Sequence, residues 1–505
     1  MARCACAIYT SAVVSVILLF VGIGLLGTGV FQTLIHNRLK REITLTEGSK
    51  VFDSWKNPPP PVFMEFFFFN VTNPAEFLNG GKARLTQMGP YTYREYRPKD
   101  NVTFVENGTK VSALTPKTFV FVPELSAGDP SVDNVTTVNI PAMAVMNKLK
   151  DEYFFRKSAL SFSMSSLGTT MFETYTVDDL LWGFKDPLLT HLRKIKPEVD
   201  EYFGLMLNKN GSTDGEFVYL TGENNYLEYG RIDSWKGQKH LTFWKSDQSN
   251  MINGSDGSAF HPLLTKEERL DVFTADLCRS IHMLFEKEVE VKGIPAYRYT
   301  PPRDVLASGK NNPENEGFCL DKKNCLDDGV LNVAVCRKGA PVIFSFPHFY
   351  LGDQKYVDAI EGLKPVHEHH QTFLDLNPTT GILVRASKRA QINILLERVP
   401  GFPLTRTLNG TIFPIMFLNE SVTIDDVSAA RLHKLLSMVK LVPNFPFVLI
   451  ALGVLLLLIS ILLIIRSRQK KNSTKSETTY SPVSGKAEDS SEKNGTFVLT
   501  SVEKS

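Results

Sequence analysis

A long apolar run near the C-terminal end constrains this chain more than any other feature. Residues 447–465 include sixteen Leu, Ile, Val or Phe side chains and no ionisable group. As a helix, they would span about 28 Å, close to the hydrocarbon thickness of a bilayer. A buried core helix fits poorly, because no residue offers a polar face and the run ends at a basic cluster. The cluster, Arg466, Arg468, Lys470 and Lys471, is expected on the cytosolic side of a membrane.

A second apolar stretch occupies residues 7–35. It is about twice as long as the apolar region of a cleaved signal peptide, so a retained helix fits better than that alternative. Its flanking charges are ambiguous, and the basic cluster at the other end therefore decides the orientation. We expect cytosolic residues 1–6, a transmembrane helix at 7–35, a lumenal or extracellular domain at 36–444, a second transmembrane helix at 445–465 and a disordered cytosolic tail at 466–505.

Glycosylation sequons support this orientation independently. Eight Asn-x-Ser/Thr sequons lie between the apolar stretches, and we expect them to carry sugars. Two further matches, Asn472 and Asn494, would face the cytosol and stay bare. The eight predicted sites are Asn70, Asn101, Asn107, Asn134, Asn210, Asn253, Asn409 and Asn419.

The six cysteines form two groups. Cys4 and Cys6 would lie at the cytosolic membrane face, where palmitoylation and unmodified thiols are both open. The other four fall in the predicted lumenal domain, where an even number suggests two disulfides with three possible pairings. A zinc site would need closely paired cysteines, which are missing. These four are Cys278, Cys319, Cys325 and Cys336.

The composition of the long middle region indicates a packed, sheet-rich domain. Charged residues make up 22% of the 505 residues and the net charge is +2, which gives no indication of a nucleic-acid partner. Aromatic residues make up 10%, including 34 Phe, which favours packed sheets or an apolar cavity over disorder.

The pattern of apolar runs predicts many strands. Residues 52–74 lead from a polyproline step into a Phe-rich run, which is typical of a strand buried on both faces. Turn residues separate the other runs, without regular alternation of strands and helices. We therefore predict a large antiparallel, barrel-like domain with inserted helices. The other predicted strands are 91–96, 117–122, 218–220, 341–346 and 392–396.

Residues 139–183 form a distinct, helix-compatible stretch. Thr176 and Asp179 resemble a capping box for a short helix. Earlier in the stretch, basic residues stand among apolar ones, an arrangement that could bind anionic ligands. The alternative is an ordinary solvated helix face. The basic residues are Lys148, Lys150, Arg156 and Lys157, and the neighbouring aromatic residues include Phe154 and Phe155.

A series of short motifs, in order along the chain, resembles the class B scavenger receptors. The match covers nearly the whole middle region and both apolar stretches. The motifs are FDSW, NVTNP, GPYTYRE, NIP, LLWGFKD, NMINGSDG, FHPL, CRS, NEGFC, GVLNVAVC, FPHF and LDLNPTTG.

The resemblance implies an α+β ectodomain, with a large antiparallel β-barrel that contains a lipid tunnel and a helical bundle at the membrane-distal apex. Residues near 143–175 map onto that bundle, so Lys148, Lys150, Arg156, Lys157, Phe154 and Phe155 become candidate ligand-binding residues. The cysteine spacing resembles the lysosomal branch of the family. It implies the bridges Cys278–Cys336 and Cys319–Cys325.

The branch of the family that the chain resembles also determines which partners are expected. FPHFY resembles the lysosomal branch, whereas SFSMSSLGTTMF is more similar to the lipoprotein receptor. In the lysosomal branch, the apex binds the hydrolase β-glucocerebrosidase and carries a pH-sensing His. Tyr153 stands about where that His is expected, and no His occurs between His36 and His191.

The sequence contains no convincing catalytic or metal motif. The cluster His367, Glu368, His369 and His370 lacks the i, i+4 spacing of H-E-x-x-H, and we interpret it as a solvated loop. There is no G-x-S-x-G elbow and no phosphate-binding loop. Ser, Asp and His near Asn253 are better explained as a glycosylated turn. We expect no enzyme activity, no cofactor and no metal.

The last forty residues are rich in Ser, Thr, Lys and Glu, which favours disorder. Tyr480 and Val483 fit the tyrosine-based pattern that clathrin adaptors bind, although such short matches also arise by chance.

Together, these features predict a two-pass glycoprotein receptor of lysosomal or late endosomal membranes, or alternatively of the plasma membrane. It would bind lipids, cholesterol, phospholipid or lipoprotein particles and pass apolar ligands through an internal tunnel. The alternatives are a sorting receptor that escorts a lysosomal hydrolase and a purely structural membrane glycoprotein. Clathrin adaptors are expected to bind the tail, and a homo-oligomer is compatible with the sequence.

Overall fold

The computed structural model describes residues 2–321, 325–337 and 339–477. They divide into two compact units. One, the terminal unit, combines residues from the two ends of the chain, up to Gln32 and from Lys440. The other, the ectodomain unit, extends from Thr33 to Val439.

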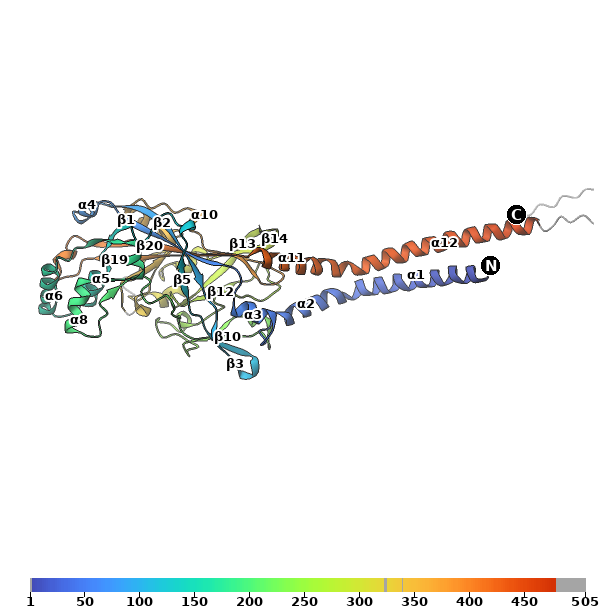
Figure 1. The fold of residues 1–505 in the computed structure, drawn as a ribbon, viewed down its shortest axis with the longest axis horizontal. Helices are drawn as coiled ribbons and strands as arrows, with labels where there is room; N and C mark the ends of the chain where they lie inside the picture. Colours follow the sequence, from blue (N-terminus) through green and yellow to red (C-terminus); the bar gives the residue numbers. More distant parts are fainter. Residues whose placement is uncertain (1, 322–324, 338, 478–505) are drawn as a thin grey trace, which may run out of the picture. The chain divides into compact units, whose positions relative to one another are not determined.

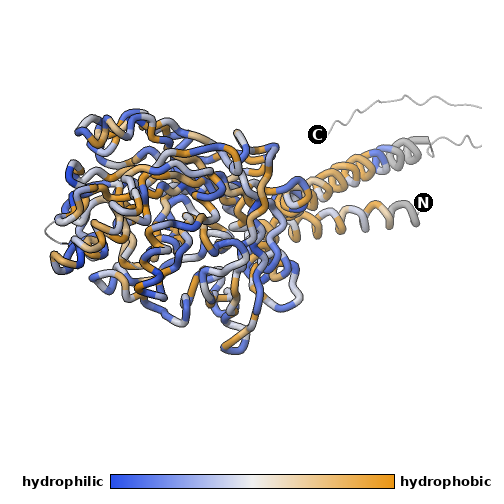
Figure 2. Tube along the Cα trace, turned by 60° about the vertical axis from the view of Figure 1, so that its left-hand side comes forward, coloured by the Kyte–Doolittle hydropathy of each residue, from blue (hydrophilic) through white to orange (hydrophobic). Residues whose placement is uncertain are grey.

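In the terminal unit, the helices α1 (Ala2–Thr28) and α12 (Phe445–Glu477) lie side by side (Figure 1). Both are long and apolar enough to cross a membrane, and hydrophobic residues cover most of their described length (Figure 2). The first apolar stretch is not one continuous helix as predicted. Gly29 adopts a left-handed φ of 58°, which ends α1, and α2 (Val30–Glu42) follows.

A large sheet forms the centre of the ectodomain unit (Figure 1). Its strands are far apart in sequence, and β19 and β20 are its longest. Along the sheet, the strands are β12 (Leu270–Thr274), β13 (Arg279–Val291), β14 (Ile294–Thr300), β18 (Phe373–Leu376), β19 (Leu383–Glu397), β20 (Asn409–Thr423), β1 (Val62–Val71), β2 (Ala83–Tyr96) and β17 (Ile360–Glu361). Three more strands pair beside this path, namely β5 (Thr118–Phe121), β15 (Val330–Asn332) and β16 (Val342–Ser345).

Most neighbouring strands of this sheet are antiparallel, as predicted, but β17 pairs with β2 in parallel. The prediction of a closed barrel is not met. In the part of the chain that the structure describes, the order ends at β12 on one side and β17 on the other, without a hydrogen-bonded connection between them. β17 itself pairs with β2 through only two residues, Ile360 and Glu361.

The Phe-rich run forms β1, which lies between β2 and β20. Phe66, Phe68 and Phe69 are fully buried, while Phe63 and Phe67 are half-buried. No residue of this strand is exposed, as expected for a central strand covered on both faces. The Phe-rich run therefore supplies much of the apolar core.

Smaller sheets complete the ectodomain unit. The order β11 (Ile232–Trp235), β10 (Phe217–Leu220), β4 (Lys110–Leu114), β3 (Asp100–Val105) forms a second sheet, and two ribbons pair β6 (Asn134–Val138) with β7 (Phe172–Thr176) and β8 (Phe184–Lys185) with β9 (Tyr202–Phe203). The helices are α3 (Lys50–Lys56), α4 (Pro74–Leu78), α5 (Ile140–Lys148), α6 (Phe154–Ser166), α7 (Val177–Trp182), α8 (Pro187–Ile195), α9 (Gln354–Asp358), α10 (His367–His370) and α11 (Asp426–Leu441).

The predicted short helix is α7, and Thr176 caps it. The Thr176 hydroxyl accepts a hydrogen bond of 3.1 Å from the Asp179 backbone N–H. All the predicted strands are found, and the mixed α+β class is confirmed.

Candidate ligand-binding surface

Two helices carry the predicted ligand-binding residues. They are α5 and α6, which gather with α8 at one end of the ectodomain unit (Figure 1). Asn139 caps α5 by accepting a hydrogen bond of 3.0 Å from the Ala142 N–H. We call the exposed face of this pair the α5–α6 surface. It comprises Lys148, Lys150, Tyr153, Phe154, Phe155, Arg156, Lys157 and Phe162.

The two helices are anchored by one apolar face each. Met143 and Met146 of α5 and Leu160 and Met164 of α6 are buried in the core. Their spacing of three or four residues places each pair on one side of its helix. The opposite side of α6 therefore faces solvent, whatever residues it carries.

That solvent-facing side of α6 is aromatic. Tyr153 is 73% exposed, Phe154 77%, Phe155 67% and Phe162 75%. The rings of Tyr153 and Phe155 stack with centroids 6.3 Å apart. Soluble proteins seldom expose several large apolar side chains together unless the surface meets a membrane or a partner. These rings therefore make α6 a candidate interaction surface.

Most of the basic residues on this surface already have partners. Arg156 forms an ion pair of 2.8 Å with Glu152, and Lys150 lies 3.9 Å from Glu397. The Lys157 ammonium donates a hydrogen bond of 3.1 Å to the Lys150 carbonyl. Lys148 is exposed and has no partner among the described residues. The surface is thus less cationic than the sequence predicted and more strongly aromatic.

A small pocket lies beside α6 and was not predicted. Its volume is about 390 Å³, and Lys185, His191 and Lys194 supply basic side chains. Leu167, at the end of α6, also lines it. Its three basic residues lie on β8 and α8, outside the predicted stretch, and the clustering of Arg193 and Lys194 in the last turn of α8 was the only sequence signal.

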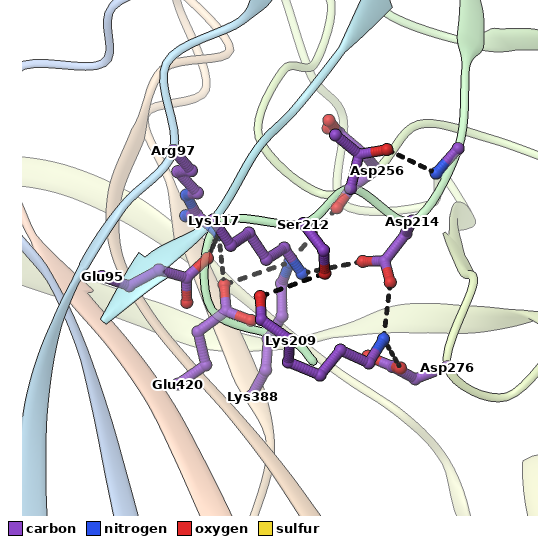
Figure 3. A network of polar contacts seen from close by, with 12 residues as sticks. Glu95, Arg97, Lys117, Lys209, Ser212, Asp214, Asp256, Asp276, Lys388 and Glu420 are labelled. Carbon is purple, nitrogen blue, oxygen red and sulfur yellow. Dashed lines mark hydrogen bonds and ion pairs between the residues drawn. The ribbon is translucent and has the colours of Figure 1, made fainter. Parts of the chain in front are cut away.

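The interior of the ectodomain unit contains a network of charged side chains (Figure 3). Arg97 forms an ion pair of 2.6 Å with Glu420, and Lys117 pairs with Asp214 at 3.0 Å. Burial opposes ionisation of Glu420, but Lys388 and Arg97 together hold its pKa below the usual range. The network members are Glu95, Arg97, Lys117, Lys209, Asp214, Asp256, Asp276, Lys388 and Glu420.

Glu95 differs from the other acids of this network. Its side chain is 0% exposed, and neither carboxylate oxygen has a hydrogen-bond partner. Burial, reinforced by the negative charge of Glu420, raises the pKa of Glu95. This part of the interior is therefore polar and charged, and any apolar path must avoid it.

The lumenal cysteines lie in two places. Cys319 and Cys325 form a disulfide in the structure. Cys278 and Cys336 are free thiols whose side chains are hydrogen-bonded to each other. That contact, together with burial, raises the pKa of the Cys278 thiol. The bridge between Cys278 and Cys336 thus stays a prediction.

The predicted sugar sites differ in exposure. Asn101, Asn107, Asn134, Asn210 and Asn409 are exposed, whereas Asn70, Asn253 and Asn419 are half-buried. Exposed side chains can accept a sugar without rearrangement. For the half-buried three, glycosylation stays a prediction, as it does for the exposed sites.

The predictions at the two chain ends are largely outside the structural description. Cys6 is an exposed free thiol in α1, while the side chain of Cys4 is not described. Tyr480 and Val483 lie outside the described residues. Palmitoylation and adaptor binding therefore stay predictions.

The histidine cluster is solvated only in part, because Glu368 and His369 are exposed but His370 is not. His367 and His370 bound the short helix α10, and His370 is 5% exposed because it packs against His348. Near the Asn253 turn, His261 pairs with Glu268 at 2.6 Å rather than with a serine. Among the described residues, no group of three or more His, Cys, Asp or Glu side chains could hold a metal.

Comparison with known proteins identifies the family. The family model described as the CD36 family matches residues 13–464, which include most of both terminal helices and the whole ectodomain unit. The chain belongs to the CD36 family.

Relatives within the family fall into two groups. The chain is 44% identical to human lysosome membrane protein 2 over 89% of this chain and 93% of the relative. The identity to the rat protein of the same name is 45%, over 90% of this chain and 94% of the relative. Scavenger receptor class B member 1 from pig is 34% identical over 90% of this chain and 89% of the relative.

Membership confirms the predicted resemblance to class B scavenger receptors. The CD36 family consists of receptors, and this chain is not an enzyme. The two apolar helices at the ends of the chain fit a two-pass membrane protein, as does the similarity to lysosome membrane proteins.

Proposed function

We propose that this protein is a two-pass receptor of lysosomal or late endosomal membranes that binds lipid surfaces or lipid-bearing particles through its α5–α6 surface. The exposed aromatic side of α6 carries the proposal. Three Phe side chains, each at least 67% exposed, are available to enter an apolar phase. Full burial of one such side chain is favourable by about 1.5–3 kcal/mol.

The basic residues supply the second part of the interaction. Lys148 has no partner among the described residues, and Lys150, Arg156 and Lys157 remain at least partly accessible to solvent. Near an anionic lipid surface, each basic side chain contributes about 1 kcal/mol. Aromatic insertion together with this attraction favours anionic lipid over neutral lipid.

Passage of apolar ligands through the ectodomain is the further part of this proposal. The aromatic core around β1 supports it, because Phe66, Phe68 and Phe69 belong to one large apolar cluster. The charged network around Glu95 limits it, since an apolar ligand cannot replace ion pairs. A route would therefore follow the Phe66–Phe69 part of β1, since Val62 and Met64 at its start pair with Glu95 and Glu420.

The charge contribution is tested with a fourfold variant, Lys148→Gln, Lys150→Gln, Arg156→Gln and Lys157→Gln. The full chain in nanodiscs is mixed with phosphatidylserine vesicles, and co-flotation is measured. We expect binding to fall several-fold and to become insensitive to salt. The control variant replaces four exposed basic residues elsewhere with Gln, namely Lys82, Lys239, Lys310 and Arg431. Equal losses in both variants, or no loss in the first, would contradict the proposal.

Escort of a lysosomal hydrolase is the second candidate. The similarity to lysosome membrane protein 2 and the exposed rings of Tyr153 and Phe155 favour it, because aromatic side chains are common at protein interfaces. Pull-down of β-glucocerebrosidase by the nanodisc-embedded chain, at neutral pH and at pH 5, separates the two functions. Hydrolase capture that is lost in Phe155→Ser, without vesicle binding, would favour escort.

A further inference from the structure

A second pocket lies on the central sheet, away from the α5–α6 surface. Its volume is about 520 Å³, and we call it the histidine pocket. Strands β1, β2, β19 and β20 contribute residues to it, as do α10 and the segment around the FPHF motif. The side chains that matter here are Phe67, His348, Lys364, His370, Arg389 and Phe417.

Two stacked imidazoles form part of its wall. The rings of His348 and His370 have centroids 4.3 Å apart and an interplanar angle of 12°. The backbone N–H of Lys364 donates to His348 Nδ1 at 3.0 Å, and that of Val366 donates to His370 Nδ1 at 2.9 Å. Because each Nδ1 accepts a hydrogen bond, the proton of each neutral ring is on Nε2.

The two Nε2 atoms differ in their partners. His348 Nε2 donates to the Gln87 side-chain oxygen at 2.8 Å. His370 Nε2 has no hydrogen-bond partner within the described ranges, and the residue as a whole is only 5% exposed. Because His370 lines the pocket, its Nε2–H is available to donate a hydrogen bond to an occupant.

The backbone here is held in an uncommon conformation. His348 and Phe349 have left-handed φ values of 53° and 57°. This conformation is strained for residues other than glycine, and such strain is typically retained at functional sites. The side-chain oxygen of Gln391 accepts the His348 N–H at 2.6 Å and fixes this conformation.

The pocket also has an excess of positive charge. Neither Lys364 nor Arg389 has a carboxylate within ion-pair distance in the part of the chain that is described. Arg389 donates to the Gln371 carbonyl, and burial lowers the pKa of its guanidinium although the negative charge of Glu65 acts in the opposite direction. The nearby carboxylate of Glu65 accepts a hydrogen bond from the Asn419 amide. His369 also lines the pocket.

An apolar wall completes the pocket. The rings of Phe67 and Phe417 stack with centroids 4.5 Å apart and an interplanar angle of 9°. Phe417 also contacts His348 and His370 edge-on. The pocket lining thus combines two apolar rings with an N–H donor and two cations.

We propose that the histidine pocket binds an oxyanion, such as a carboxylate, carried on an apolar group. Arg389 and Lys364 neutralise the charge, His370 Nε2–H donates a hydrogen bond, and Phe67 with Phe417 contacts the apolar part. This site is separate from the α5–α6 surface, so either proposal can fail without the other.

The test measures binding of radiolabelled benzoate to the full chain in nanodiscs by equilibrium dialysis at pH 7. We expect saturable binding of one equivalent, weakened about tenfold or more in Arg389→Gln and in Lys364→Gln, since each removes a charge-assisted contact. Lys364 is exposed, so its replacement leaves folding intact. The control Lys82→Gln removes an exposed charge elsewhere and is expected to bind like the wild type. Benzamide, which lacks the charge, should not compete.

Two further measurements define the ligand source. Competition by acetate at concentrations comparable to benzoate indicates a small free anion, whereas competition by laurate at much lower concentrations indicates a lipid carboxylate. The laurate outcome supports the proposal, whereas acetate competing as well as benzoate would contradict the apolar contact with Phe67 and Phe417. Asn419, a predicted sugar site, also lines the pocket, so Asn419→Gln is measured in parallel. Absence of saturable binding, equal affinity in Arg389→Gln and the wild type, or binding only in Asn419→Gln would overturn it.

Discussion

At the residue scale, Glu95 is a carboxylate that the fold buries without a hydrogen bond. Its ion pair with Arg97 is long, at 3.9 Å, and Glu420 competes for the same guanidinium at 2.6 Å. The raised pKa follows, because burial and a neighbouring negative charge both disfavour ionisation. A folded-state pKa above the unfolded value means that the folded protein binds this proton more tightly.

Glu95→Gln should therefore stabilise the ectodomain at neutral pH, by roughly 1–3 kcal/mol, because it removes the buried charge. The advantage should shrink as the pH falls toward the ordinary value of 4.5, since Glu95 is then protonated in the native protein as well. Urea unfolding at pH 7 and pH 5 checks this. A variant less stable than the wild type at pH 7 would show that the charge is stabilising.

His348 should act in the opposite direction. Burial lowers its pKa to about 4, so the folded state binds this proton less tightly than the unfolded state. Stability is then lost as the pH falls from about 6.5 toward 4, and His348→Gln should reduce the loss between pH 7 and pH 5 by about 1–2 kcal/mol. Urea unfolding at pH 7 and pH 5 measures this loss of stability, with His433→Gln as the control at an exposed histidine. An unchanged pH dependence would contradict the assignment.

At the element scale, α1 and α12 approach each other closely at small residues. The Ser460 hydroxyl donates to the Ser11 hydroxyl at 3.0 Å. A Cβ placed on Gly453 would lie 3.0 Å from Leu19 Cγ and 3.1 Å from the Ser15 carbonyl oxygen. Such close packing is typical of helix pairs in membranes.

Gly453→Leu should therefore separate the two helices. In the background Ser11→Cys with Ser460→Cys, oxidation should join the helices readily, and Gly453→Leu should reduce the cross-linked fraction severalfold. Gly24→Leu is the matched control, since no atom lies within 4 Å of its Cβ position. Equal cross-linking in the two Leu variants would show that the approach at Gly453 does not hold the pair together.

Sequence patterns predicted the elements better than their assembly. The Phe-rich run, the capped α7 and both apolar helices follow from local periodicity and capping, and these are found. The order of the large sheet could not be predicted, because it pairs β20 with β1 across most of the chain. An open sheet and a closed barrel have the same local pattern.

The binding sites show the same limit. Basic residues near α6 were recognised from composition, but their ion pairs with Glu152 and Glu397 depend on neighbours that sequence does not reveal. Nothing in the sequence indicated that His348 and His370 stack, because only the fold brings them together. His370 was therefore interpreted as solvated. Separate local motifs gave no signal for the shared pocket.

At the scale of the whole molecule, we propose that this receptor has two distinct places for ligands. Membership of the CD36 family and the two apolar helices establish the receptor class. The α5–α6 surface is proposed to meet lipid surfaces, and the histidine pocket to hold an oxyanion. The charged network leaves the part of the interior around Glu95 poorly suited to apolar ligands (Figure 3).

The central claim is that the aromatic side of α6 enters lipid. The most direct measurement is the affinity of the nanodisc-embedded full chain for phosphatidylserine vesicles, compared with Phe154→Ser, Phe155→Ser and Phe162→Ser combined. The matched control replaces three exposed apolar residues elsewhere, Val132, Leu227 and Ile382, with Ser. We predict that the α6 variant binds at least about tenfold more weakly, since partial burial of three Phe side chains is lost, and that the control is unchanged. Wild-type affinity in the α6 variant would contradict the claim.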